Sequence, residues 1–251
     1  MKYFPAFLFL FCATWHSFAQ DNSYKLHQYS SSPSARALWV QAVDKYDRNE
    51  NNNDTILAAV DLLNAAIGID HNYYNAYERK AHLLTVVQKY QSALDVVNEM
   101  IRLNPGSAEL YRYEGLLQYK SGAYKKSMIS FEKSLQLCNQ DLKDAVKAVN
   151  AVAKDTIVEA KSELYKQREY ADRKLIVATD ARAVGLVLTN KKEGRMMLDT
   201  LYNRYTAGVS GAARFTGSQA YLYKDKSKDE IIDYLLSLKR DRRDLGIQVV
   251  R

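Results

Sequence analysis

Cysteine, proline and glycine are all scarce in this chain, and each scarcity narrows the choice of fold. Only Cys138 lies beyond the apolar N-terminal segment, so the rest of the chain cannot form an internal disulfide. No proline follows Pro105, which removes the strongest helix breaker from the C-terminal half. Because 47% of the residues are hydrophobic, the chain can still bury a core. We therefore expect an all-α fold.

Signatures of catalysis and of metal or cofactor binding are missing as well. Beyond the N-terminal segment the histidines are His27, His71 and His82, and no two have the i, i+4 spacing that grips zinc on a helix. There is no P-loop, and the Gly-Val-Ser-Gly run at 208–211 is one residue short of a nucleophile elbow. We predict no enzyme activity, no cofactor and no metal. An acid–base site within 172–251 remains the alternative, because catalytic pairs need not be adjacent in sequence.

The N-terminal segment has the features of a secretory signal peptide. A short basic start precedes the apolar run from Phe4 to Thr14, and Ser17 and Ala19 supply the small residues that a signal peptidase reads. The run is far shorter than the ~20 residues of a membrane-spanning helix. We predict that residues 1–19 are removed and that the mature chain has no transmembrane segment. The signal and the Asn-, Lys- and Tyr-rich body resemble those of exported proteins from Bacteroidetes-like Gram-negative bacteria, and this resemblance implies a periplasmic location.

The charge balance is basic, with a formal net charge of +7 that becomes +6 when Lys2 is lost with the signal. Export argues against nucleic acid as the partner. Anionic polysaccharides, lipid headgroups or acidic proteins fit a basic exported chain better. A solvated basic surface that keeps the protein in solution explains the charge equally well. After the signal, residues 20–34 are polar and serine-rich and are expected to form a flexible leader.

From residue 35 to residue 139 similar residues recur with a period of 34 positions. Positions related by this period carry Ile56, Tyr90 and Tyr124; Ala59, Ala93 and Ser127; Leu63, Val97 and Phe131; and Ile69, Leu103 and Leu137. A period of this length is typical of stacked helical hairpins, each burying its apolar face against its neighbours. We predict three units, 35–72, 73–106 and 107–139. The first unit has four extra residues, which fall in the polar loop Asp47 to Asp54.

Small residues recur where the two helices of a unit are expected to cross closely. They are Ala59, Ala81, Ala93 and Gly115, and a bulky side chain there would hold the helices apart. Gly122 is expected in the turn of the third unit.

This pattern resembles the tetratricopeptide repeat (TPR) family over residues 35–139. The family signature is matched in the third unit by Tyr111, Gly115, Ser127 and Phe131, and in the second by Tyr77, Ala81, Leu84, Ala93, Val97 and Pro105. The chain departs from the signature at its leucine, which is replaced by Ala42, Lys80 and Glu114.

The resemblance implies a concave groove lined by the first helix of each unit, through which such proteins bind partners. The inward positions would be Gln41, Asp44 and Arg48, then Asn75, Arg79 and His82, then Arg112, Tyr113, Leu116 and Tyr119. Arginine pairs with carboxylates and tyrosine offers contact area at low entropic cost. For Tyr113 and Tyr119, packing on the next helix is the alternative. The groove does not carry the residues of the family's carboxylate clamp.

The remainder, residues 140–251, is predicted to be mostly helical. An apolar stripe makes 140–170 either a degenerate fourth repeat or one long capping helix. Further helices are expected over 172–188, from Asn190 with a capping box to Glu193, and from Ile231 to Leu238 after a capping box of Ser227 and Glu230. Glycines at 208, 211 and 217 predict a loop, and Ala220 to Tyr223 a short strand.

From the sequence we expect an exported TPR-type scaffold that binds a protein or peptide in the bacterial envelope. Two other interpretations remain open. One is an envelope enzyme whose catalytic domain is C-terminal. The other is a binder of anionic polysaccharide or lipid headgroups through the basic run Lys239 to Arg243.

Overall fold

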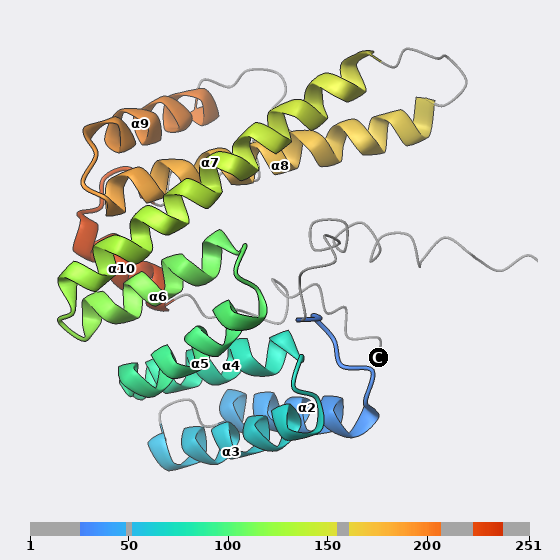
Figure 1. Ribbon diagram of the computed structural model, residues 1–251, viewed down its shortest axis with the longest axis vertical. Coiled ribbons are helices and arrows are strands. Elements are labelled where there is room, and N and C mark those ends of the chain that lie inside the picture. The colour runs from blue at the N-terminus through green and yellow to red at the C-terminus, as the bar shows by residue number, and fades with distance from the viewer. Residues whose placement is uncertain (1–25, 49–51, 155–160, 207–222, 238–251) are drawn as a thin grey trace, which may run out of the picture. The chain divides into compact units, whose positions relative to one another are not determined.

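The computed structural model describes residues 26–48, 52–154, 161–206 and 223–237, and their regular structure is entirely helical (Figure 1). The helices are α2 (Pro33–Arg48), α3 (Asn53–Ile69), α4 (Tyr74–Val86), α5 (Tyr90–Leu103), α6 (Ala108–Lys120), α7 (Tyr124–Lys154), α8 (Lys161–Leu188), α9 (Lys192–Thr206) and α10 (Lys228–Ser237). Apart from one isolated bridge between His27 and Tyr73, these ranges contain no β-structure. The predicted all-α fold class is confirmed.

Many of the helices that follow one another in the chain pack against one another. Packed pairs are α2 with α3, α3 with α4, α6 with α7, α7 with α8, and α8 with α9. The 34-residue period reappears in the helix starts, since Tyr74 and Ala108 begin α4 and α6, and Tyr90 and Tyr124 begin α5 and α7. The arrangement of consecutive, contacting helices is that of a helical solenoid.

The chain divides into two compact units. Unit 1 comprises Met1–Val87 and Asp95–Gly106, and unit 2 comprises Gln88–Leu94 and Ser107–Arg251. One division falls between Gly106 and Ser107, where the second expected repeat gives way to the third, but Gln88–Leu94 of the second repeat belongs to unit 2. The boundary expected at residue 139 falls inside α7, which continues to Lys154 and lies beside α8 (Figure 1). The interpretation of 140–170 as one long capping helix therefore needs correction, because two helices that pack on each other share this segment.

The extra residues of the first repeat lie between α2 and α3. Helix α2 ends at Arg48 and α3 begins at Asn53, so part of the expected loop is helical. The side-chain oxygen of Asn52 accepts a hydrogen bond from the Thr55 N–H at 3.0 Å, which satisfies a first-turn amide of α3. The last residue of the insertion, Asn52, is thus the N-cap of α3.

Residues in the left-handed region end two of the repeat helices. Gln88 after α4 has φ 57° and Gly122 after α6 has φ 78°, and the two stand one period apart. The N–H of Gly122 donates to the carbonyl of Tyr119, and that of Ala123 donates to the carbonyl of Gln118. These two bonds form a Schellman motif, which satisfies the last carbonyls of the helix. The turn predicted at Gly122 is confirmed.

Small residues lie at close contacts, as the sequence indicated. Ala59, Ala81 and Ala93 are fully buried. A Cβ atom built on Gly115 would lie 2.5 Å from two ring carbons of Phe131. Gly115 therefore lets the ring of Phe131 on α7 reach the backbone of α6.

The C-terminal helices differ in detail from expectation. Helix α8 starts at Lys161, earlier than the predicted 172. Asn190 does not cap the next helix. It adopts φ 59° after α8, where its N–H and that of Lys191 donate to the carbonyls of Val187 and Leu186. A residue predicted to begin one helix therefore terminates another, because asparagine tolerates the left-handed region as well as the N-cap position.

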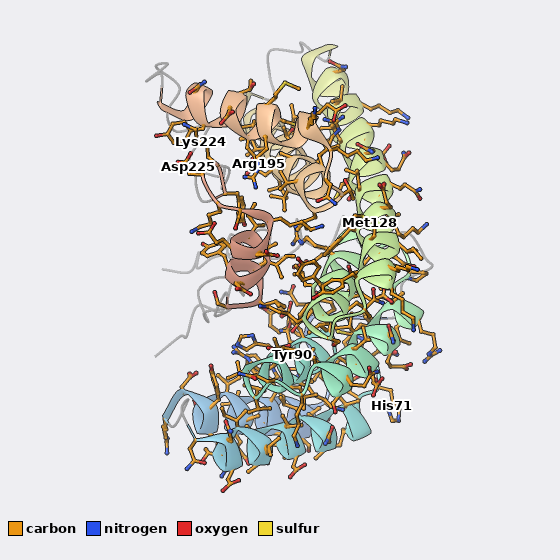
Figure 2. The ribbon with its side chains drawn as sticks, turned by 90° about the vertical axis from the view of Figure 1, so that its left-hand side faces the viewer. His71, Tyr90, Met128, Arg195, Lys224 and Asp225 are labelled. Carbon is orange, nitrogen blue, oxygen red and sulfur yellow. The ribbon has the colours of Figure 1, made fainter. Side chains whose placement is uncertain are left out.

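The turn before α10 is attached to α9 by Arg195, which donates hydrogen bonds to backbone carbonyls of the turn. Nη1 of Arg195 donates to the carbonyl oxygens of Tyr223 and Lys224, each at 3.2 Å. Figure 2 shows Arg195 on α9 beside the segment that carries Lys224 and Asp225. The predicted capping box is confirmed, since the Ser227 N–H donates to the Glu230 carboxylate at 2.7 Å and the Glu230 N–H donates to Ser227 Oγ at 3.2 Å. Helix α10 begins at Lys228, three residues before the prediction. The glycine loop predicted at 207–217 lies outside the described residues, as does the expected strand except for Tyr223.

The expected leader is anchored at its described end. The His27 N–H donates to the carbonyl of Asn72 and the Tyr74 N–H donates to the carbonyl of His27, both at 2.9 Å. Nε2 of His27 lies 2.7 Å from Oδ2 of Asp70. These contacts attach residues 26–32 to the turn between α3 and α4. The predicted signal peptide lies outside the described residues.

Candidate binding surfaces

The predicted groove residues of α2 lie on its polar side. Gln41 and Arg48 are exposed and Asp44 is half-buried. The core side of the helix carries Ala35, Trp39, Ala42, Val43 and Tyr46. The 3.6-residue periodicity of α2 separates the two sets.

The predicted groove residues of α4 are brought together, but they are buried. Asn75, Arg79 and His82 are spaced four and three residues apart, which places them on one face of the helix. They are 2%, 7% and 7% exposed, and Glu78 beside them is also buried. We call these four residues the α4 polar face. Sequence reasoning missed Glu78, although its position three residues after Asn75 places it next to the same face.

Aromatic residues of α2 contact the α4 polar face. The indole N–H of Trp39 donates to the backbone carbonyl of Asn75 at 3.2 Å. The ring of Tyr46 meets that of His82 edge to face, with centroids 6.2 Å apart and an angle of 84° between planes. The face is therefore bordered by two aromatic rings from the neighbouring hairpin of unit 1.

The carboxamide of Asn75 is buried without a hydrogen bond. Both Oδ1 and Nδ2 lack a partner, although the residue lies in the first turn of a well-packed helix. A buried polar group left unpaired costs about 1–3 kcal/mol, and native structures contain few of them. The carboxamide thus carries an unused acceptor and unused donors at a predicted groove position.

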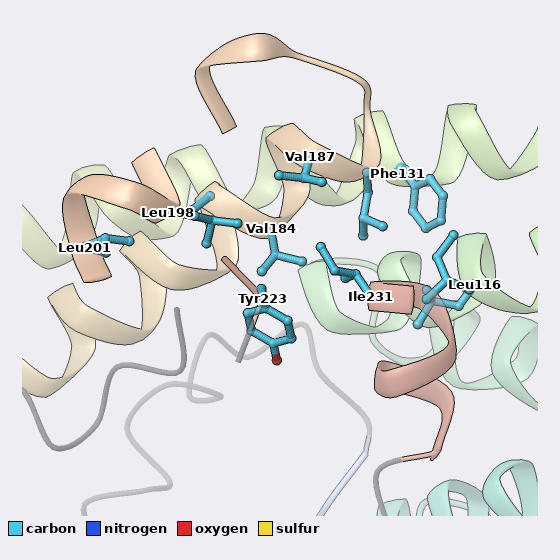
Figure 3. Close-up of a cluster of buried hydrophobic side chains, with 11 residues drawn as sticks. Leu116, Phe131, Val184, Val187, Leu198, Leu201, Tyr223 and Ile231 are labelled. Carbon is cyan, nitrogen blue, oxygen red and sulfur yellow. The ribbon is translucent and has the colours of Figure 1, made fainter. Parts of the chain in front are cut away.

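The predicted groove residues of α6 lie in or beside the hydrophobic core of unit 2. Leu116 is a core member with 3% exposure, and Tyr113 and Tyr119 pack against that core. Arg112 is half-buried, with Nη2 3.9 Å from the Glu109 carboxylate. The core draws its other members from α7, α8, α9, α10 and the turn before α10, as Figure 3 shows for Phe131, Val184, Val187, Leu198, Leu201, Tyr223 and Ile231. The α6 residues and the α4 polar face belong to different compact units.

Helix α10 packs on the core beside the predicted groove residues of α6. Ile231 and Ile232 are fully buried in the core that contains Leu116. The Tyr119 hydroxyl donates to Oδ1 of Asp229, and Lys120 forms an ion pair with Asp233. The bond to Asp229, together with burial, raises the pKa of Tyr119 to about 12. The bond to Asp233 raises the pKa of Lys120. Sequence reasoning found the start of α10 but gave no signal of where it docks.

Lys228, the first residue of α10, lies among groups from three other elements. Its Nζ stands 5.5 Å from the ring centroid of Tyr119 and 5.7 Å from that of Phe131. The same atom lies 3.3 Å from Oδ1 of Asn190, to which it donates. Burial lowers the pKa of Lys228. Cation–π contacts of this kind favour a fixed position of the helix N-terminus.

Chemically reactive or metal-binding groups do not gather in the described part of the chain. Among these residues no three His, Cys, Asp or Glu side chains are placed to hold a metal ion. Cys138 is buried, and burial raises the pKa of its thiol, which keeps it unreactive. None of the described helices has both the length and the apolar character that crossing a bilayer requires.

Comparison with protein-family models gave no match for this chain, and comparison with curated proteins gave none either.

Proposed function

We propose that this protein is an exported TPR-type scaffold that binds a protein or peptide partner, and that the α4 polar face is part of the binding site. The proposal makes the chain a binding protein of the bacterial envelope without enzymatic activity. It draws on the 34-residue period, on the helical hairpins and on the signal-like N-terminal segment.

The observation that carries the proposal is the unpaired carboxamide of Asn75. A carboxamide offers one acceptor and one NH₂ donor side by side, which matches the N–H and C=O of a peptide group. Pairing with a ligand would recover the cost of leaving these atoms unsatisfied. Since Asn75 is almost fully buried, neighbouring side chains must rearrange when a ligand binds, as side chains commonly do at interfaces.

The test separates binding from folding at this position. Asn75→Leu replaces the carboxamide with an apolar group of similar shape. We expect it to leave the free energy of unfolding unchanged or to raise it, because no hydrogen bond is lost. A random 12-residue peptide library displayed on phage would be selected on the mature chain, and the most enriched peptide titrated by calorimetry. Asn75→Leu should weaken that peptide at least tenfold, about 1.4 kcal/mol.

The matched control is Asn64→Leu, which makes the same change at an exposed position of α3. It should leave peptide affinity unchanged. If Asn75→Leu is stably folded and binds the selected peptides as tightly as the original chain, the α4 polar face is not the binding site.

A further inference from the structure

The surface on which α10 docks has the composition of a site for a short helix. The buried core that holds Ile231 and Ile232 of α10 also contains Leu116 on α6, Phe131 on α7, and Val184 and Leu188 on α8, and Tyr119 on α6 packs against it, all within unit 2. We call these five residues from α6, α7 and α8 the α10 docking face. Apolar side chains form its centre, and the Tyr119 hydroxyl and the adjacent Lys120 supply polar groups at its edge. This is the layout by which grooves recognise amphipathic helices.

Helix α10 itself has the properties of a bound peptide. It has ten residues, which is below the roughly 12–15 that a helix needs to be even marginally stable in water. Its helical form therefore depends on docking. Asp229 and Asp233 stand one turn apart, on either side of Ile231 and Ile232 in the sequence. The carboxylate of Asp229 accepts a hydrogen bond from Tyr119, and that of Asp233 pairs with Lys120. The two isoleucine side chains are buried in the core.

The polar contacts at the edge are accessible to solvent. In the Lys120–Asp233 pair the side chains are 33% and 59% exposed, and the Tyr119–Asp229 bond is also at an exposed site. Exposed pairs contribute little affinity, but they set the register and orientation of a docked helix. In the folded chain the two carboxylates thus set the register of α10, and the two isoleucines between them supply its buried contacts.

We propose that the α10 docking face is a binding site for amphipathic helices that carry two carboxylates one turn apart around a pair of branched aliphatic residues. Helix α10 is its resident occupant and closes the site in the free protein. A partner helix with the same pattern displaces α10. This inference rests on the proposed binding function. Failure of this inference can be told apart from failure of the proposed function, because the Asn75 experiment tests a residue of unit 1 and the α10 experiment tests a surface of unit 2.

The first experiment makes the site available within the full mature chain. A peptide with the sequence of residues 224–237, acetylated, amidated and labelled with fluorescein, is titrated by fluorescence anisotropy. Ile231→Asp undocks the resident helix, because a charge cannot enter the core without a large desolvation cost. Since the resident helix competes as an intramolecular ligand, the labelled peptide should bind Ile231→Asp at least about 100-fold tighter than the original chain.

The register is tested by exchanging charges across the face. In the Ile231→Asp chain, Lys120→Glu should weaken the peptide at least about fivefold, and a peptide carrying Asp233→Lys should recover the loss. Lys125→Glu, at an exposed position of α7, is the control and should change nothing. Failure of the peptide to bind a folded Ile231→Asp chain, or equal weakening by the control, overturns the proposal.

A second measurement needs no substitution, in case Ile231→Asp does not fold. Hydrogen exchange of the original chain should show α10 amides exchanging at least about 100-fold faster than those of 183–188 in α8, because α10 opens while the rest of unit 2 remains folded. Excess unlabelled peptide should speed the exchange of α10 further. If α10 and α8 exchange at one common rate with and without peptide, α10 is a permanent part of the core and the inference is wrong.

Discussion

The phenolic hydroxyl of Tyr119 on α6 donates a 2.5 Å hydrogen bond to Oδ1 of Asp229 on α10, across 110 positions of sequence. The bond joins a residue predicted for a partner-binding groove to a helix of the same chain. It favours the protonated phenol, and together with burial it raises the pKa of Tyr119 to about 12. The ionisation of Tyr119 should therefore be linked to the docking of α10.

Docking of α10 should weaken in strong alkali. An unfolded tyrosine ionises near pH 10, whereas Tyr119 in the folded protein ionises near pH 12. The raised pKa means that the stabilisation is complete below about pH 10 and is lost as the pH rises through 12. Urea unfolding of the original chain and of Tyr119→Phe measures the difference. It should be below about 1 kcal/mol at pH 8, because the bond lies at an exposed site, and should shrink towards zero by pH 12.

The control for this series is the same Tyr119→Phe comparison in an Asp229→Ala chain, in which the hydroxyl of Tyr119 has lost its carboxylate partner. In that background the stability difference should not depend on this bond and should be smaller at pH 8. A Tyr119→Phe difference that stays constant between pH 8 and pH 12 would contradict the assignment of the titration to this bond.

Gly115 is predicted to be irreplaceable by alanine. A Cβ there would stand 2.5 Å from two carbons of the Phe131 ring, whose side chain is fully buried and cannot move aside. Gly115→Ala should lower the free energy of unfolding by about 1–3 kcal/mol, the usual cost of overpacking. Gly68→Ala is the matched control, since no atom lies within 4 Å of its added Cβ and alanine favours the helix by up to about 1 kcal/mol. Chemical denaturation should give the two variants opposite signs.

The turns that end α4 and α6 should respond oppositely to substitution. Gly122 has φ 78°, where a side chain costs about 1–2 kcal/mol, so Gly122→Ala should destabilise the protein by about that amount. Gln88 already bears this cost at φ 57°, so Gln88→Gly should be neutral or should stabilise by up to about 1 kcal/mol. Thermal unfolding of both variants measures the shifts. A loss of stability in Gln88→Gly would show that its side chain has a packing role that outweighs the backbone.

The anchor of the leader should release in acid. Burial acts to raise the pKa of Asp70, but hydrogen bonds from Ser30, His27 and the Asn72 N–H together lower it. A lowered pKa stabilises the fold above the unfolded value of about 3.9, and this contribution is lost as the pH falls through the folded value. Asp70→Asn should therefore cost about 1 kcal/mol at pH 6, and the difference should decline below about pH 4. Urea unfolding of the original chain and of Asp70→Asn between pH 6 and pH 3 measures the decline, and a difference that stays constant over this range would contradict the prediction.

Helix lengths, turns and caps follow largely from the local sequence, as three sets of residues illustrate. The 34-residue spacing predicted helical hairpins of constant length, and α4 and α6 begin 34 residues apart because each hairpin repeats the same helix and turn lengths. Gly122 and the Ser227–Glu230 box were predicted because backbone conformation and capping depend on the residues at hand. Asn190 was assigned to the wrong helix end, since asparagine suits both ends and only packing selects between them.

The candidate binding residues could be predicted only in part. The sequence placed Asn75, Arg79 and His82 on one helical face through their spacing alone. It did not reveal that this face is buried or that Glu78 belongs to it, because burial depends on which other elements lie over α4. Likewise nothing in the residues of α6 indicates that α10 covers them.

By itself, the sequence determined the all-helical class, the hairpin period, the turn at Gly122 and the cap at Ser227, because these depend on backbone preferences and on spacings within a few tens of residues. The tertiary structure alone decided that Leu116 is a core residue, that Tyr119 bonds to Asp229 and that the carboxamide of Asn75 has no partner. Such relationships join residues that are distant in sequence, or depend on the absence of a neighbour in space. These relationships depend on how side chains pack in three dimensions, which a local sequence pattern does not specify.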